Sequence, residues 1–195
     1  MATAVTTDEI YERYLRKAIT EINRLSQEIG QAADGAPIAL PTGHPLATIS
    51  LLKYGPQTQE LQEGVAFHGR AGNALIKSLQ RLSVDPMEVY GTNCVKFSGA
   101  ALDTSAAWLQ RELRIIQPRL VVVMGDDALD FLNGIGFPLS QPVEGRLGEL
   151  QRFTPTIEAL AVPDIDLSLD GQAEKTAYWN AFKAVGPWWA ALPPY

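Results

Sequence analysis

A glycine-rich loop, residues 64–72, is the part of this sequence best suited to hold a ligand with its backbone. The loop reads GVAFHGRAG and leads into a helix-like run that starts at residue 73. Glycines let the backbone approach a ligand closely, and a helix start presents free N–H groups with partial positive charge. Phe67 is therefore either a platform for stacking a planar ring or a core residue of an ordinary connection. His68, beside it, is a candidate contact to the same ligand.

Two strand ends supply further groups for such a site. A short apolar strand at residues 48–53 stops at the turn Tyr54-Gly55-Pro56, and a second strand at 88–93 ends on Asn93. In open parallel sheets ligands collect beyond the carboxyl ends of the strands, so we expect the turn, Asn93 and the glycine loop to share one crevice. Asn93 offers a donor and an acceptor to one planar partner, as reading a nucleobase edge requires; the alternative is an Asx-turn.

Two carboxylates follow the last apolar strand, residues 157–162. Asp164 and Asp166 come directly after Pro163, beside the expected crevice. A carboxylate at this place could orient a water molecule toward a bound substrate. Equally, both acids could cap the next segment and face the solvent.

The elements that position these residues alternate between helices and strands. Four apolar strands, at residues 48–53, 88–93, 120–124 and 157–162, are separated by helical stretches. Connections of this length force neighbouring strands to run parallel, with right-handed crossovers. The sequence therefore predicts an α/β fold, a three-layer α/β/α sandwich with a four-stranded parallel sheet.

The two ends of the chain add one element each to what we expect to be a single domain over residues 1–195. At the start, residues 1–32 carry an amphipathic helix, which a capping box at Thr6 opens. At the other end, residues 187–195 are rich in aromatic side chains. Since large aromatic residues usually bury, we expect this segment to form a strap packed over the core.

Composition excludes several classes of function. The chain has 195 residues and a net charge of −6, which argues against a protein whose main task is to bind phosphates. One cysteine, Cys94, and two separated histidines exclude internal disulfides and a closed metal site, so we expect no metal or cofactor and a cytoplasmic location. No apolar run approaches the ~20 residues of a membrane span. The glycine patterns typical of dinucleotide and nucleoside triphosphate sites are also missing.

Four segments follow one another in a recognisable order. They are residues 49–56, the loop 64–72, the strand end YGTNCVK at 90–96, and IQPRLVVVMG at 116–125. In this order they resemble the uracil-DNA glycosylase superfamily, and most closely its iron-sulfur bacterial and archaeal branch, over roughly residues 40–170. In that family a phenylalanine stacks on an extruded uracil and an asparagine bonds its edge, which implies those roles for Phe67 and Asn93. The resemblance also implies the strand order 2-1-3-4.

Several positions depart from that family's pattern. Its Gly-Glu-Ala-Pro-Gly motif reads Lys53-Tyr54-Gly55-Pro56-Gln57 here, so Tyr54 stands where the family has its water-activating carboxylate. Its His-Pro-Ser motif reads Val162-Pro163-Asp164, so Val162 replaces the histidine that stabilises the departing uracil. Phe97 and approximately Ser105 fill two of the four cluster-cysteine positions. The resemblance therefore implies that this chain holds no iron-sulfur cluster.

Two hypotheses for the function follow. In the first, the chain is a divergent glycosylase that binds a nucleobase in DNA or a nucleotide-like ligand and cleaves N-glycosidic bonds weakly or with altered specificity. Asp164 is then the candidate catalytic residue, and the candidate binding residues are Tyr54, Gly55, Pro56, Phe67, His68 and Asn93. In the second, it is a catalytically inactive pseudo-glycosylase that serves as a protein interaction module. The acidic net charge and residues 165–167 (IDL), where the family inserts a wedge into DNA, favour the second.

Overall fold

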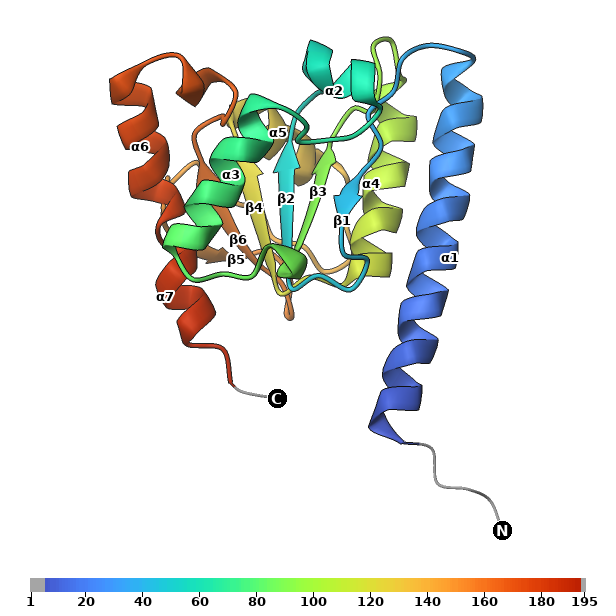
Figure 1. Ribbon diagram of the computed structural model, residues 1–195, viewed down its shortest axis with the longest axis horizontal. Helices are drawn as coiled ribbons and strands as arrows, with labels where there is room; N and C mark the ends of the chain where they lie inside the picture. Colours follow the sequence, from blue (N-terminus) through green and yellow to red (C-terminus); the bar gives the residue numbers. More distant parts are fainter. Residues whose placement is uncertain (1–5, 194–195) are drawn as a thin grey trace.

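Six strands form one central sheet in the computed structural model, which describes residues 6–193 (Figure 1). Four of these strands run parallel, in the spatial order β3, β2, β4, β6. Their bounds are β2 (Ile49–Lys53), β3 (Val89–Asn93), β4 (Leu120–Met124) and β6 (Glu158–Val162). Because β2, β3, β4 and β6 are the four predicted apolar strands in chain order, the expected order 2-1-3-4 is confirmed.

Two short antiparallel strands widen the sheet beyond the four that the sequence predicts. β1 (Thr42–Gly43) pairs with β3, and β5 (Leu150–Arg152) pairs with β6. Each lies at an edge of the sheet. A strand of two or three residues is too short to show a recognisable alternation of apolar and polar side chains, so the expected count omits both.

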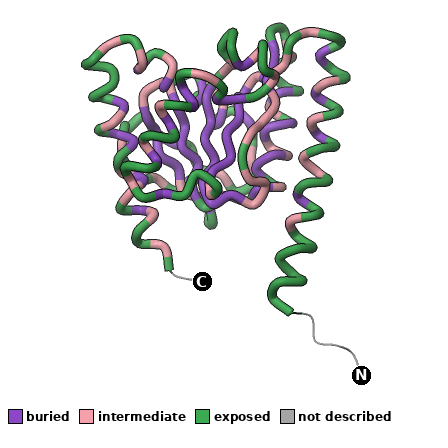
Figure 2. The backbone as a smooth tube through the Cα atoms, viewed as in Figure 1, coloured by how far each residue is buried: buried purple, intermediate pink, exposed green. Residues whose placement is uncertain are grey.

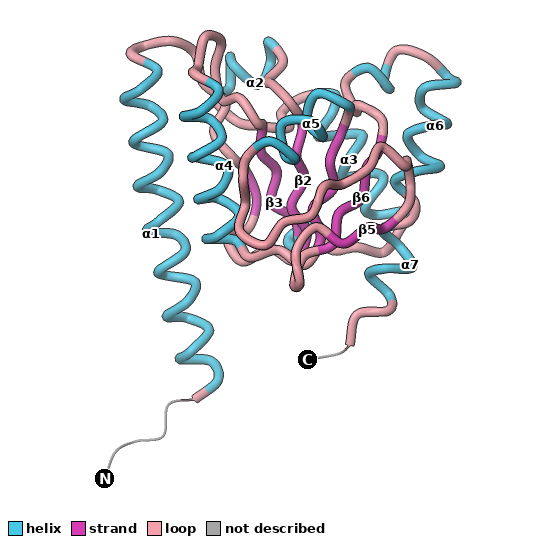
Figure 3. The backbone as a smooth tube through the Cα atoms, turned by 180° about the vertical axis from the view of Figure 1, so that it is seen from behind, coloured by secondary structure: helices cyan, strands magenta, loops and turns pink. Residues whose placement is uncertain are grey.

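Helices cover both faces of the sheet and complete the three layers (Figure 3). One face carries α3 (Arg70–Arg81), α6 (Gln172–Phe182) and α7 (Val185–Ala190), and the other carries α4 (Leu102–Ile116) and α5 (Asp126–Gly134). Leu51 and Leu52 of β2 belong to the two different cores, because successive strand side chains point to opposite faces. Figure 2 shows the parallel strands buried between these layers. Glu158, at the start of β6, is partly exposed.

Three short elements connect the layers. The first is α2 (Thr58–Glu63), which the sequence patterns did not reveal; the others are single 3₁₀ turns, η1 (Pro86–Glu88) and η2 (Leu167–Leu169). α2 is one and a half turns long, too short for a helical period to emerge. It lies above the sheet in Figure 1, directly before the glycine loop.

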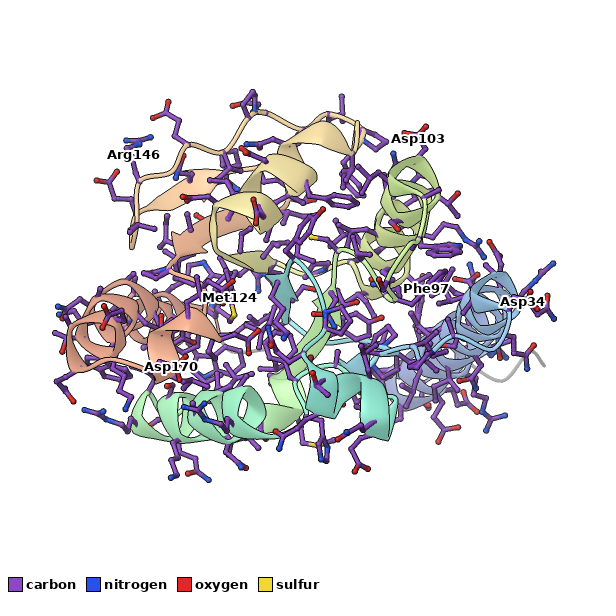
Figure 4. The ribbon with its side chains drawn as sticks, turned by 90° about the horizontal axis from the view of Figure 1, so that it is seen from above. Asp34, Phe97, Asp103, Met124, Arg146 and Asp170 are labelled. Carbon is purple, nitrogen blue, oxygen red and sulfur yellow. The ribbon has the colours of Figure 1, made fainter. Side chains whose placement is uncertain are left out.

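The N-terminal helix α1 (Thr7–Ala33) lies beside α4, and its first half extends beyond the rest of the molecule (Figure 1). The predicted capping box is present, because Thr6 and Glu9 bond each other's backbone N–H groups. The second half of the helix buries Leu25 and Ile29 in a cluster with Phe97 of the loop after β3. Figure 4 shows the labelled Phe97 between α4 and α1.

The chain after α6 continues as the short helix α7, which includes the start of the segment expected to form a strap over the core. Trp188, in α7, is buried in the core beneath α3 and α6. Its indole N–H donates to a Glu158 carboxylate oxygen at 2.6 Å. Residues 194–195 of the expected strap lie outside the described residues. Within residues 6–193, no helix is both long and apolar enough to cross a membrane.

Candidate functional site

The carboxyl ends of the four parallel strands form one row of side chains. Lys53 is in register with Asn93 on one side and Met124 on the other, and Met124 is in register with Val162. All four belong to the face that α3 covers. Leu51, Val122 and Leu160, two positions before three of them, pack in that core, and Gly91, two positions before Asn93, lies against the Phe67 ring. Figure 4 looks down on this edge, with Met124 labelled. This row is the floor of the candidate site.

Phe67 lies on the same face, held by two glycines. Its backbone is left-handed, with φ of 59°, which is uncommon for a residue with a side chain. A Cβ at Gly72 would lie 1.9 Å from the carbonyl oxygen of Phe67, and a Cβ at Gly91 would lie 2.7 Å from its ring. Gly91 precedes Asn93 by two residues on β3, so the structure brings Phe67 and Asn93 to one place, as the sequence predicts.

Asn93 is fully buried, and its carboxamide is left without a partner. Neither the side-chain oxygen nor the side-chain nitrogen has a hydrogen-bond partner among residues 6–193. Its backbone carbonyl, in contrast, accepts a hydrogen bond from the Lys96 ammonium at 2.6 Å. Leaving a buried polar group unpaired costs about 1–3 kcal/mol. The buried carboxamide of Asn93 therefore destabilises the fold unless a ligand supplies its hydrogen-bond partners.

Lys53 is a site residue that the sequence analysis did not single out. Its side chain is 1% exposed, and its ammonium bonds Glu60 and also Asp166, the latter at 2.7 Å. The same ammonium lies 5.6 Å from the centre of the Phe67 ring. The available signal was a lysine at the end of an otherwise apolar strand, which needs a counter-charge when buried.

Glu60 ties together the start of α2, the glycine loop and Lys53. One carboxylate oxygen accepts from the backbone N–H of Phe67 at 2.5 Å, and the other accepts from that of Gln57 at 2.6 Å and from Lys53. Glu60 thus fixes the backbone of Phe67 and the charge of Lys53 at once. The spacing of Gln57 and Glu60 is that of a capping box, a signal that could have revealed α2.

Asp164 caps the turn that follows β6. One of its carboxylate oxygens accepts from the backbone N–H groups of Asp166, at 2.7 Å, and Leu167, at 3.3 Å. Burial raises the pKa of the Asp164 carboxyl above its usual range, and these two N–H groups act in the opposite direction. Asp166 is held by Lys53 and, at 3.3 Å, by the side-chain amide of Gln57.

The other four predicted binding residues are exposed or partly exposed, whereas Phe67 and Asn93 are buried. Tyr54 is exposed and packs edge-on against Phe131 of α5, at the opposite face of the sheet, with Gly55 and Pro56 partly exposed beside it. His68 is exposed and lines a hollow of about 230 Å³ beside Asp166. The structure therefore does not gather all six predicted binding residues into one pocket.

A larger cavity, of about 870 Å³, lies at the other end of the sheet, where the parallel strands begin. Arg119, Arg152 and Glu158 are among the residues that line it. It contains none of the predicted site residues, and volume alone does not identify an active site. We therefore place the candidate site at the carboxyl edge.

A comparison with known protein families identifies the family to which this chain belongs. The sequence pattern of the Uracil DNA glycosylase superfamily matches residues 17–183, which include all four parallel strands and every candidate site residue. The chain belongs to this superfamily. This superfamily member is similar to the Type-4 uracil-DNA glycosylase of Archaeoglobus fulgidus. The two sequences are 24% identical over 155 residues, which cover 74% of this chain and 78% of that protein.

Two of the positions that the resemblance assigns to cluster cysteines carry other side chains in this superfamily member. Phe97 and Ser105, at two of the cysteine positions, are buried, and Phe97 packs on Trp108 with ring centres 6.1 Å apart. Cys94, the single cysteine, is buried on the opposite side of β2 from the candidate site. Within residues 6–193, no three His, Cys, Asp or Glu side chains form a group suited to a metal ion.

Proposed function

We propose that this chain is a divergent uracil-DNA-glycosylase-like protein that binds a nucleobase, in DNA or in a nucleotide-like ligand. The observation that carries the proposal is the unpaired, buried carboxamide of Asn93 on the Phe67 side of the sheet. A pyrimidine edge offers a donor and an acceptor side by side, which is the complement of that carboxamide. Family membership supports the same class of ligand.

Cleavage of the N-glycosidic bond is proposed to be weak or altered. Val162 stands in the place of the leaving-group histidine, is 1% exposed, and has no group that could bond a departing base. Tyr54 brings no carboxylate and lies against α5. Loss of one such stabilising donor costs about 10²-fold or more in rate, so we expect activity on uracil in DNA at least ~10²-fold below an ordinary member. Asp164 is the proposed catalytic carboxylate for any activity that remains.

The first test is incubation with single- and double-stranded DNA that contains uracil, hypoxanthine or xanthine, scored as strand breaks after alkali. In parallel, calorimetry measures the affinity for free uracil in the parent chain and in Asn93→Asp, whose carboxylate accepts hydrogen bonds but cannot donate them. We expect at least a 10-fold loss of affinity in this variant. The matched control is Asn180→Asp, an exposed position on α6. Equal affinity in Asn93→Asp, or efficient release of uracil from DNA, would refute the proposal.

The second candidate function is the inactive pseudo-glycosylase that acts as a protein interaction module. It is favoured by Lys53, whose ammonium lies over the ring of Phe67, a residue that is only 6% exposed. This candidate predicts no detectable affinity for any base and no strand breaks with any of the three DNA substrates.

A further inference from the structure

The space above Phe67 is already filled by a charged side chain of the protein itself. Two aromatic rings in contact have their centres 4.5–7 Å apart, so a base stacked on Phe67 would have its centre at that distance. The Lys53 ammonium lies 5.6 Å from the centre of the Phe67 ring, within the same range. Lys53 also neighbours Asn93 directly in the sheet register. A lysine in the position of the first glycine of the family motif thus occupies the face on which a base would stack.

We propose that Lys53 limits the entry of a base into this site, because its ammonium holds the place of the base until Lys53 and Asp166 separate. This inference rests on the proposed function. It adds that the parent chain rests in a closed state, in which neither Phe67 nor Asn93 can be reached. The measured affinity for a base is then the intrinsic affinity reduced by the fraction of open molecules.

The contacts of Lys53 show which of its two ion pairs can break more easily. Glu60 is 1% exposed and is fixed by the backbone N–H groups of Phe67 and Gln57. Asp166 is 16% exposed and belongs to the turn between β6 and η2. Its other side-chain contact is with Gln57, an exposed residue, at 3.3 Å. Opening therefore consists of parting Lys53 from Asp166 and moving its ammonium off the Phe67 ring, while Glu60 keeps its place.

The first measurement of the test needs no ligand. Brief treatment of the folded protein with acetic anhydride, followed by mass spectrometry, compares Lys53 with the exposed lysines Lys77, Lys175 and Lys183. We expect Lys53 to react at least 10-fold more slowly than these three in the parent chain. In Asp166→Asn, which keeps the shape of the side chain, Lys53 should react at least 5-fold faster than in the parent. The matched control is Asp170→Asn, which removes an exposed ion pair with Arg70.

The second measurement is the affinity for free uracil by calorimetry. Asp166→Asn and Lys53→Ala should bind uracil at least 10-fold more tightly than the parent, whereas Asp170→Asn should match it. Should Lys53→Ala fail to fold, as circular dichroism would show, Asp166→Asn carries the comparison alone.

Three outcomes would overturn the inference. If Lys53 in the parent reacts as fast as the exposed lysines, the closed state does not exist. If the parent binds uracil and neither variant binds it more tightly, Lys53 does not limit entry, although the proposed function stands. If no form of the protein binds uracil while the labelling behaves as expected, the proposed function fails, and the inference about ligand entry fails with it.

Discussion

Asn93 and Lys96 stand three residues apart at the end of β3, and their side chains contrast sharply. Lys96 is fully buried with all of its bonding satisfied by Glu112 at 2.9 Å, by Thr92 and by the Asn93 carbonyl oxygen. Burial raises the pKa of the Glu112 carboxyl, and the Lys96 ammonium acts in the opposite direction. This ion pair anchors the backbone of Asn93 from the far side of the sheet, so the unpaired carboxamide stands on a rigid support.

Asp164 gives the prediction for catalysis at the scale of one residue. In Asp164→Asn the side-chain oxygen can still accept from the N–H groups of Asp166 and Leu167, so the turn should keep its shape. If Asp164 orients water, this variant should lose turnover on any base that the parent releases, with unchanged affinity for that base. A carboxylate acts as a base only when deprotonated, so the raised pKa should make parent activity fall as pH decreases through that value. Steady-state rates between pH 4 and 8 measure both effects.

If Asp164→Asn still turns over its substrate, the catalytic group lies elsewhere and Asp164 only caps the turn after β6. The same conclusion follows if the activity of the variant decreases at low pH in the same way as that of the parent. The affinity measurement separates a lost chemical step from a damaged pocket, because a damaged pocket would weaken binding as well.

At the scale of elements, α1 provides apolar packing for α4 and for the loop after β3. Leu25 and Ile29 of this helix pack in one cluster with Phe97 and Trp108. Trp108 also donates its indole N–H to Glu28 of α1 at 3.0 Å. The helix therefore holds the loop after β3 by burial of apolar side chains.

Ile29 tests this role of α1. The residue is completely buried, so Ile29→Ala should lower the free energy of unfolding by about 2–5 kcal/mol through lost burial and the cavity left behind. The control is Ile19→Ala on the same helix, which is 43% exposed and should change stability by less than about 0.5 kcal/mol. Urea unfolding followed by tryptophan fluorescence measures both. Equal effects of the two substitutions would mean that α1 contributes nothing specific at Ile29.

The elements also show what could be read from the sequence and what could not. The strand Leu120–Met124 was predicted with its observed bounds, because five consecutive apolar residues leave little choice for a strand covered on both faces. The capping box of α1 could also be predicted, because it depends on two residues only three positions apart. The contact of Lys53 with Asp166 joins residues 113 positions apart, and no local pattern carries such information. Tyr54 was expected beside Phe67, although the alternation along β2 already placed it on the opposite face.

At the scale of the whole molecule, the negative net charge disfavours extensive contact with the phosphates of DNA. The net charge is −6, and the first turns of α5 bring Asp126, Asp127 and Asp130 to the carboxyl edge of the sheet, which also carries the candidate site. A duplex or single strand presented to this edge would meet these carboxylates with its phosphates. Binding at this site should therefore depend on contacts to the base far more than on contacts to the backbone.

Charge also provides a test of how DNA is held. The number of phosphates contacted sets the salt dependence of affinity, with a slope near −0.7 per contact for single strands. We expect the affinity for a uracil-containing single strand to change by less than about 10-fold between 50 and 200 mM salt, and free uracil to show no change. Neutralising the edge in Asp127→Asn/Asp130→Asn should tighten DNA binding at 50 mM salt by roughly 3- to 10-fold. The control, Glu12→Gln/Glu21→Gln on α1, makes the same change in net charge away from the edge and should have a smaller effect. Equal effects of the two pairs, or a steep salt dependence in the parent chain, would show that DNA is held by another surface.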